Sequence, residues 1–274
     1  MAPNEIKTIF ARSNRVNQAC SEAEACLRAS LEAAGLEVVD SFDGTAGQAP
    51  DLVVLLGGDG FLMEFLRDYG FPRVPIFGVN FGTVGFLMNP HDTLDDIVSI
   101  LKQRRFETAK HRLLRANFRL EEGEERTLLA FNEVLLERQT GQSVRLEVAI
   151  DDVPFHRFAG DGVLISSPAG STAYNLAAGG PALHPGVRGI VLTPLYPHRA
   201  EPFHSLQFSV VLPAESRVTV VPQELPKRRM RLVADGQASR DVARVEVSPS
   251  EHEVTLLRTY GQEFIRSVSQ KFIG

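Results

Sequence analysis

Short apolar runs alternate with helical patterns over the first hundred residues of the chain. Strand candidates lie at Ile6–Phe10 and within "LEVVDSF", "DLVVLL" and "VPIFGVN". An Ala/Glu/Leu-rich segment, which Ser13 or Asn14 is expected to cap, ends at Gly35, and the apolar residues of "FLMEFLRDYG" recur at helical spacing. Strands joined by helices pair in parallel, because each helix carries the chain back to the edge where the previous strand began. The pattern predicts an α/β domain with a doubly wound, mostly parallel sheet.

Two later segments also have a helical pattern. In "TLDDIVSILKQRRF", Leu94, Ile97 and Leu101 share one stripe, with acids in the first turn and bases in the last, as the helix dipole favours. In "EFIRSVSQKFI", Phe264 and Val268 are spaced by one helical turn, which predicts a terminal helix.

The pattern of apolar and polar residues changes near Leu113. From there the chain carries short β-rich runs, such as "LLRANFRL", "VRLEVAI" and "RVTVVP", separated by turn residues. Several of these runs alternate apolar and polar residues with a period of two, which is typical of strands with one buried face. The sequence therefore predicts a mostly β second domain, with one short helix after Ser171.

Composition and net charge limit the classes of molecule that the chain is expected to bind. The chain is 43% hydrophobic and 23% charged, as in an ordinary globular protein. Its formal net charge of −5 argues against nucleic acid as a partner. No apolar segment approaches the roughly 20 residues that span a bilayer, and "MAPNEIKTIF" lacks the regions of a signal peptide. We therefore expect a cytoplasmic protein that binds neither nucleic acid nor membrane.

The loop "LLGGDGF" joins an apolar strand to a helix. Its glycines allow backbone N–H groups to approach a ligand at the positive end of the helix, which suits phosphate. No GK[ST] follows, so the loop is not a Walker A motif. Met63 stands where the dinucleotide fingerprint requires its third glycine. Neither standard nucleotide motif applies.

Asp59 puts a carboxylate at the centre of this loop. At ~4 Å it would repel a phosphate oxygen by about 1 kcal/mol in water, and by more in a partly buried site. Two chemical roles remain: to hold a divalent cation, or to accept a proton from a hydroxyl that attacks a phosphoryl group. Both indicate phosphoryl transfer. The alternative, that Asp59 caps the following helix, is left open by the loop alone.

The segment "GDGVLISSPAGSTAYNLAAGGPALHP" gathers small residues, hydroxyls and one aromatic ring. A strand, "GVLIS", leads to Ser171 or Thr172, either of which can cap a short helix that stops at Gly179. Such a surface can hold ribose, amide or phosphate groups, with Tyr174 packed against a ring. The alternative is a glycine-rich connection within a β domain.

Asn132 and Glu133 interrupt the otherwise apolar "LLAFNEVLLE". A paired amide and carboxylate can hydrogen-bond the two hydroxyls of a ribose, or can hydrogen-bond a neighbouring loop. The residue types favour neither role. Further on, "ADGQ" at Ala234–Gln237 predicts first a turn between two strands, and only weakly a site.

Taken in order, "LLGGDG", "GVNFGTVGFL", "FNEVLLE", "AGDGVLISSPAGSTAYNLAAGGP" and "ADGQ" resemble the NAD kinases of bacteria, from about Asp51 to Gln237. The GGDG motif alone also occurs in related lipid kinases and, in altered form, in phosphofructokinases. The long GSTAY segment with NE ahead of it is more specific. The resemblance implies an α/β domain of residues 1–110 joined by about 256–274, a β-rich NAD-binding domain of residues 111–255, and a site between the two domains.

The reaction that the resemblance implies is transfer of the terminal phosphoryl group of ATP, or of polyphosphate in some members, to NAD. The acceptor is the 2′-hydroxyl of the adenosine ribose, and the product is NADP. Asp59 is implied to be the general base that takes the proton of this hydroxyl. The resemblance also implies a divalent metal, usually Mg²⁺, whose protein ligands are unknown from the sequence, and assembly into homodimers or homotetramers.

By the same matching, the dinucleotide and its phosphates are implied to contact Gly58, Gly60, Phe86, Asn132, Glu133, Asp161, Thr172, Ala173, Tyr174, Asn175, Ala177 and Gln237. The two glycines would line the phosphate path, Phe86 would pack near the adenine, and Asp161 would bind the nicotinamide end.

The chain departs from the family pattern at three positions. Ala159 stands where an arginine is often found, Ala169 where many members have Thr or Ser, and Ala177 where Ser is frequent. Relative to the family pattern, the chain therefore lacks one cation and several side-chain hydrogen bonds. These groups bear on the preference for the phosphoryl donor and on the affinity for the nucleotide.

Two other function classes remain as alternatives. A lipid kinase can share the GGDG loop, but it has no use for the NE and GSTAY segments. A non-catalytic NAD(P) sensor would bind the nucleotide without forming NADP, and the intact Asp59 argues against it.

Overall fold

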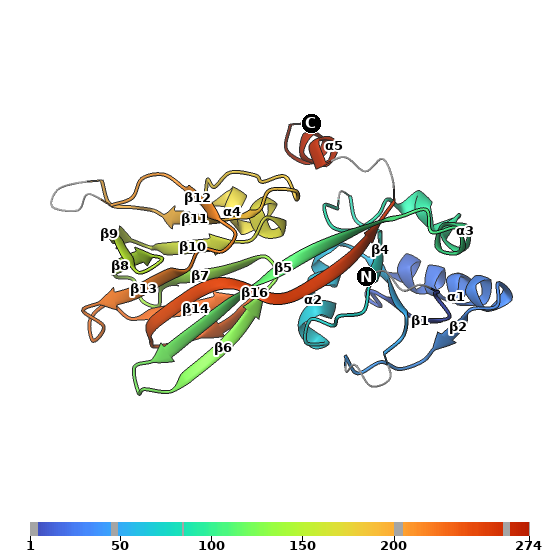
Figure 1. The fold of residues 1–274 in the computed structure, drawn as a ribbon, viewed down its shortest axis with the longest axis horizontal. Helices are drawn as coiled ribbons and strands as arrows, with labels where there is room; N and C mark the ends of the chain where they lie inside the picture. Colours follow the sequence, from blue (N-terminus) through green and yellow to red (C-terminus); the bar gives the residue numbers. More distant parts are fainter. Residues whose placement is uncertain (1–4, 45–48, 84, 200–204, 260–263, 274) are drawn as a thin grey trace. The chain divides into compact units, whose positions relative to one another are not determined.

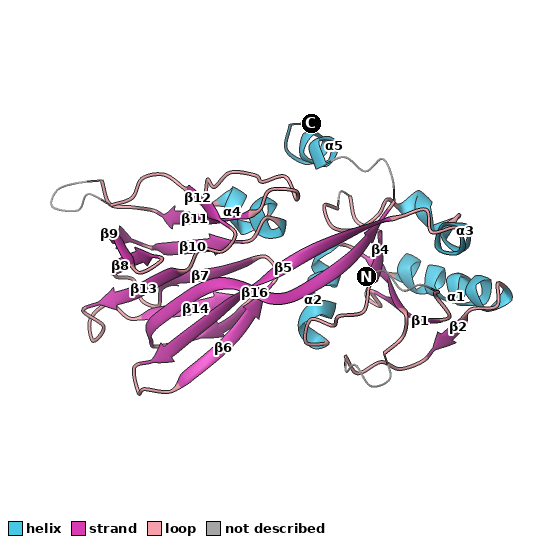
Figure 2. Ribbon diagram, viewed as in Figure 1, coloured by secondary structure: helices cyan, strands magenta, loops and turns pink. Residues whose placement is uncertain are grey.

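The computed structural model describes residues 5–44, 49–83, 85–199, 205–259 and 264–273 (Figure 1). The chain divides into two compact units, Met1–His111 with Glu253–Gly274, and Arg112–His252. Figure 2 shows helices and strands alternating in the first unit, and strands dominating the second. The predicted fold class, an α/β domain followed by a mostly β domain, is confirmed.

The first unit is built on parallel strands in the order β2-β1-β3-β4, with the end of β16 beside β4. Its strands are β1 (Thr8–Ser13), β2 (Glu37–Val39), β3 (Leu52–Gly57) and β4 (Ile76–Asn80). Its helices are α1 (Gln18–Ala33), α2 (Asp59–Asp68), the 3₁₀ turn η2 (His91–Leu94), α3 (Ile97–Lys102), α5 (Phe264–Val268) and the π turn η4 (Ser269–Ile273). Every residue of β3 is buried, as expected for a central strand covered on both faces.

Helix α1 begins later than its sequence pattern predicts. Its cap is Asn17, whose side chain accepts the N–H of Ala19 at 3.0 Å, so the prediction of Ser13 or Asn14 is wrong. Ser13 still belongs to β1 and bonds Glu24 through its N–H and hydroxyl.

The second unit carries two antiparallel sheets. One has the order β12-β11-β10-β7-β14-β15, and the other joins β16-β13-β8-β9 with β5 and β6. The strands are β5 (Glu107–Leu120), β6 (Glu125–Ala130), β7 (Glu133–Arg138), β8 (Val144–Ile150), β9 (Val153–Gly160), β10 (Gly162–Ser166), β11 (Gly189–Leu195), β12 (Val210–Pro213), β13 (Val218–Gln223), β14 (Met230–Ala234), β15 (Gln237–Ser239) and β16 (Val242–Arg258).

Side chains from both sheets form one buried apolar core in the second unit. It includes Ala116 of β5 and Val220 of β13 from one sheet, and Leu136 of β7, Ile165 of β10 and Leu232 of β14 from the other. Buried residues alternate with less buried ones along β14 and along the second half of β5, which is typical of the packing of a β-sandwich.

Two short helical elements follow β10: the 3₁₀ turn η3 (Ala169–Thr172) and α4 (Tyr174–Ala177). The predicted short helix after Ser171 is therefore confirmed. The predicted terminal helix is also present, as α5 continued by η4. Among the described residues, no helix combines the length and apolar character needed to cross a bilayer.

Candidate functional site

The carboxylate of Asp59 lies at the carboxyl end of β3. Gly58 is the N-cap of α2 and has extended backbone, and Asp59 is the first residue of the helix. The side chain of Asp59 accepts hydrogen bonds from the backbone N–H of Phe86 at 2.7 Å and of Leu87 at 3.2 Å. The helix-capping alternative is wrong, because this carboxylate bonds a distant loop and not its own helix.

The loop that carries Phe86 and Leu87 can approach Asp59 because residue 85 is a glycine. A Cβ atom at Gly85 would lie 3.1 Å from Asp59 Oδ1 and 3.3 Å from Asn80 Oδ1. Any larger residue would therefore push the loop away from the carboxylate. Gly58 and Gly60 are different: a Cβ at Gly60 would meet nothing within 4 Å in the described part of the chain, and one at Gly58 would only reach Asn80 Oδ1 at 3.9 Å.

Arg258, at the end of β16, bonds the carbonyl group of Phe86. Its Nη1 donates to the Phe86 carbonyl oxygen at 2.7 Å, while the N–H of the same residue bonds Asp59. Burial lowers the pKa of Arg258 to about 10, against the opposing effect of the Asp59 charge, so the guanidinium remains charged near neutral pH. Burial, together with Arg258, lowers the pKa of His111 to about 4, which keeps that ring neutral. Arg258 was not predicted from the sequence, because "LLRTY" does not distinguish a buried arginine from an exposed one.

Asn89 fixes the loop that carries Phe86 and Leu87. This fully buried amide donates from Nδ2 to the carbonyl oxygens of Gly78 and Leu257, both at 2.9 Å, and accepts the N–H of Thr259 at 2.9 Å. These bonds join β4 to the end of β16. Asn89 was also missed from the sequence, because its partners are far away along the chain.

The ring of Phe86 contacts the chain's own C-terminal segment. Its centroid lies 5.7 Å from that of Phe272, in a stacked arrangement, and 6.3 Å from that of Phe264. The ammonium of Lys271 lies 4.8 Å from the Phe86 centroid, within cation–π range. The implied place of Phe86 beside an adenine stays a prediction.

In the second unit, the predicted turn in "ADGQ" is confirmed. Asp235 (φ 45°) and Gly236 (φ 87°) connect β14 to β15, and two positive φ values are typical of a type I′ hairpin turn. The carboxylate of Asp235 accepts the backbone N–H of Phe131, of Asn132 at 3.0 Å and of Glu133 at 3.2 Å. The turn therefore holds the NE segment. The sequence analysis missed this role, because the DG pair was already explained as a turn.

Asn132 and Glu133 present buried acceptor atoms. Within the described residues, Asn132 Oδ1 and Glu133 Oε2 are buried and have no hydrogen-bond partner. Burial, and then the charge of Asp235, raise the pKa of Glu133 to about 7. A buried acceptor left without a donor costs roughly 1–3 kcal/mol, so such atoms in a folded protein call for an explanation, and a ligand is one.

The structure brings the NE and GSTAY segments together. Ser167 donates its N–H to the Asn132 carbonyl at 2.9 Å and its hydroxyl to the Phe131 carbonyl at 2.6 Å. A Cβ at Gly170 would lie 2.2 Å from the Asn132 carbonyl oxygen, so this contact requires glycine. Two segments that the sequence analysis singled out separately form one surface.

The predicted cap of the short helix is wrong. The N-cap of α4 is Ala173, without a side-chain bond, and the Ser171 hydroxyl donates to the Pro168 carbonyl at 2.7 Å. The side chain of Asn175 is fully buried: its Nδ2 donates to Ser171 O, and its Oδ1 accepts the Thr193 hydroxyl at 2.7 Å. Asn175 thus holds the loop in shape.

Exposed aromatic rings gather beside α4. A cavity of about 590 Å³ is lined by residues that include Tyr174, Ala177, Tyr196, Arg199 and Phe208. All three of these aromatic side chains are exposed. Rings at the wall of an open cavity are suited to stacking on a planar group.

The remaining predicted site residues lie between β9 and β10, at the start of β15, and at the end of η3. Asp161 follows β9 and forms an ion pair with Arg138 Nε at 2.8 Å. Gln237 begins β15 and is exposed, and Thr172 and Ala173 are half-buried. The sequence analysis did not identify Arg138. Within the part of the chain that the structure describes, no group of three or more His, Cys, Asp or Glu side chains forms a metal site.

Comparisons with known proteins bear on both units. The sequence model of the ATP-NAD kinase N-terminal domain matches residues 5–104, and that of the ATP-NAD kinase C-terminal domain matches residues 131–259. An NAD kinase from Xanthomonas oryzae pv. oryzae is 37% identical over 228 residues, which cover 82% of this chain and 86% of the relative. One from Xylella fastidiosa is 35% identical over 223 residues, covering 81% and 83%.

Solved structures show the same fold. A yeast NADH kinase complexed with NADH superposes with a TM-score of 0.82 at 21% identity, covering 99% of this chain and 88% of that one. An NAD kinase from Archaeoglobus fulgidus in complex with ATP superposes with a TM-score of 0.69 at 21% identity, covering 97% of each chain. With two domain models matched and relatives of this identity over four fifths of its length, the chain belongs to the ATP-NAD kinase family.

Proposed function

We propose that this protein is an NAD kinase. It transfers the terminal phosphoryl group of ATP, or of polyphosphate, to the 2′-hydroxyl of the adenosine ribose of NAD and forms NADP. The observation that carries the proposal is the orientation of Asp59, whose carboxylate is held by backbone N–H groups at the end of a buried strand instead of capping its helix. Family membership and the names of the relatives support the same reaction.

Asp59 is the general base in this mechanism. Within the described residues, each of its carboxylate oxygens accepts one backbone hydrogen bond, which leaves lone pairs that can accept a hydroxyl proton. As the ribose oxygen bonds to the terminal phosphorus, its proton passes to Asp59, and the leaving phosphate keeps the electron pair of the broken P–O bond. A positioned base contributes about 10²- to 10⁴-fold, and the rest of phosphoryl-transfer catalysis is positioning and charge stabilisation.

The second unit is proposed to bind NAD. The acceptor atoms of Asn132 and Glu133 suit hydroxyl or amino donors of the adenosine, and the Tyr174 ring suits stacking. Thr172, Ala173, Ala177, Asp161 and Gln237 complete the proposed surface, the buried Asn175 supports it by holding the loop in shape, and Phe86 is proposed to lie near the adenine. In the first unit, Gly58 and Gly60 are proposed to line the phosphate path, because packing within the described residues does not demand glycine at either position.

The described residues do not form a metal site of their own. Mg²⁺ in phosphoryl transfer takes few protein ligands beside the phosphates. The divalent metal is therefore proposed to arrive with the phosphoryl donor, where it would screen the phosphate charges, and we derive no step through it. Mg²⁺ as the metal, a cytoplasmic location and homodimers or homotetramers stay predictions from the sequence.

A product assay tests the proposal. Purified protein is incubated with Mg²⁺, with NAD or NADH, and with ATP or polyphosphate, and NADP(H) is measured. We expect NADP to accumulate with at least one donor. Nucleotide binding without any product would instead favour the sensor. Phosphorylation of a diacylglycerol or sphingoid base, with no NADP formed, would favour a lipid kinase.

A further inference from the structure

The C-terminal segment, which is α5 with η4 (residues 264–273), contacts the ring of Phe86 through three side chains. Phe272 is stacked on that ring with an interplanar angle of 19°, and Phe264 is tilted against it at 47°. The ammonium of Lys271 lies over the same ring. Stacking and cation–π contacts both use the face of an aromatic ring. The segment therefore takes up ring surface that a planar ligand would need.

The backbone of Phe86 is held independently of its ring. Its N–H donates to Asp59, its carbonyl oxygen accepts from Arg258, and neither hydrogen bond involves the C-terminal segment. The ring can therefore exchange one partner for another while the Asp59 carboxylate keeps its hydrogen bonds. Such an exchange alters the contacts of one side chain and leaves the loop in place.

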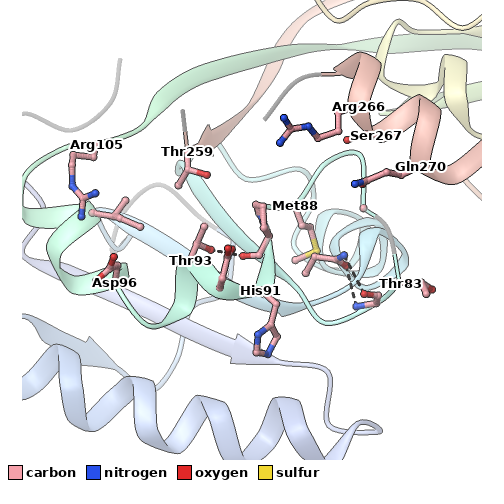
Figure 3. Close-up of a pocket in the computed structure, with 16 residues that line it drawn as sticks. Thr83, Met88, His91, Thr93, Asp96, Arg105, Thr259, Arg266, Ser267 and Gln270 are labelled. Atoms are coloured by element: carbon pink, nitrogen blue, oxygen red, sulfur yellow. Dashed lines mark hydrogen bonds between the residues drawn. The ribbon is translucent and has the colours of Figure 1, made fainter. Parts of the chain in front are cut away.

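Few buried side chains anchor the C-terminal segment. Ser267 alone is buried among the residues of α5, all of which the structure describes, whereas Ile265 is 68% exposed and Phe272 is 47% exposed. Figure 3 shows Arg266, Ser267 and Gln270 of the segment beside a cavity of about 620 Å³. Side chains that border a cavity lack van der Waals partners on that side. A segment with so few buried contacts can be displaced at low cost.

We propose that the C-terminal segment is autoinhibitory: Phe272 and Lys271 occupy the ring surface of Phe86 on which the adenine of NAD packs, and NAD displaces them when it binds. The inference rests on the proposed function, because that function supplies the adenine. The apparent affinity for NAD is then the intrinsic affinity multiplied by the fraction of molecules in which the segment has left the ring. An aromatic pair and an exposed cation–π pair each change such an equilibrium by about two- to tenfold.

Phe272→Ala tests the proposal. It removes the stacking partner, so the KM and Kd for NAD should fall about threefold or more. The kcat should change less than twofold, because the backbone of Phe86 still holds Asp59. Lys271→Ala should lower the Kd for NAD in the same way, and Phe272→Tyr, which keeps the ring, should behave as wild type.

Ile265→Ala is the matched control for Phe272→Ala, because Ile265 is an exposed apolar residue of the same segment and is not aromatic. It should leave the Kd for NAD unchanged. Weaker NAD binding by Phe272→Ala, or a Kd equal to that of Ile265→Ala, overturns the proposal.

A tryptophan reporter follows the displacement directly. The chain contains no tryptophan, so Phe272→Trp introduces a single indole at the contact with Phe86. NAD should shift its emission to longer wavelength as the indole moves into water, whereas nicotinamide mononucleotide, which has no adenine, should not. An emission that NAD leaves unchanged while calorimetry shows it bound to this variant, or that both compounds shift equally, overturns the proposal. If wild type binds NAD but forms no NADP, the proposed function fails and the tests of the segment stand.

Discussion

At the scale of single residues, the sequence identified Asp59 by an argument from charge, and the structure supplied its orientation. The carboxylate of Asp59 accepts the N–H of Phe86, and the guanidinium of Arg258 donates to the carbonyl oxygen of the same residue, at 2.7 Å each. Local patterns predict which residue is unusual. They do not predict that Arg258 bonds Phe86, which lies 172 positions away along the chain.

Arg258 is a positioning residue in this account. Arg258→Gln should lower kcat about tenfold or more, because a charge-assisted hydrogen bond to the Phe86 carbonyl is lost and the N–H that bonds Asp59 is held less firmly. The KM for NAD should change little, and Arg258→Lys should recover part of kcat. Steady-state kinetics with a thermal unfolding control measure this. A parallel rise in KM with kcat unchanged would contradict the positioning role.

Glu133 gives a prediction about pH. Its pKa is raised from 4.5 to about 7, so the folded protein binds this proton more tightly than the unfolded chain does. The stabilisation is complete below about pH 4.5 and is lost as pH rises through 7, up to roughly 3 kcal/mol in total. Urea unfolding at several pH values should therefore show wild type losing stability relative to Glu133→Gln between pH 5 and 8. Parallel stability curves for the two proteins would rule this out.

At the scale of elements, periodicity predicted whether a segment is a strand or a helix. The residues at which the helices begin depend on hydrogen bonds that form only in the folded chain. Helix α1 starts at the Asn17 cap, because Ser13 is held in β1 by Glu24. The pattern in "TLDDIVSILKQRRF" predicted a helix, but its first residues form the separate turn η2, in which the Thr93 hydroxyl donates to the Pro90 carbonyl at 2.6 Å. Helix α3 is therefore shorter than its apolar stripe.

The contact between the GSTAY and NE segments also gives a prediction. Gly170→Ala should destabilise the protein by about 1–3 kcal/mol, because the new Cβ would lie 2.2 Å from the Asn132 carbonyl oxygen and the backbone must shift. NAD affinity should fall with it, as Asn132 and Glu133 move. Gly141→Ala is the control, since a Cβ there meets nothing within 4 Å among the described residues. Urea unfolding and calorimetry with NAD measure both effects, and equal stability of the two variants would refute the prediction.

At the scale of the whole molecule, the fold class was predictable because its signals are local: alternation of strands and helices first, then short strands with a period of two. The sites were predictable in part. Asp59, Asn132 and Glu133 were singled out because polar residues interrupt apolar runs or glycine loops, and their roles stay predictions. Arg258, Asn89 and Asp235 were missed, because their function is to hold other segments through contacts made only in the folded chain.

In the proposed mechanism, Asp59 accepts the proton of the hydroxyl that is phosphorylated. Asp59→Asn keeps the shape of the side chain and can still accept a backbone hydrogen bond, but it removes the base. The decisive measurement is the single-turnover rate of NADP formation by wild type and Asp59→Asn at saturating NAD and donor, with the NAD affinity of both determined by calorimetry. We expect unchanged NAD affinity and a rate at least about a hundredfold lower in the variant. A variant that forms NADP at nearly the wild-type rate would contradict it.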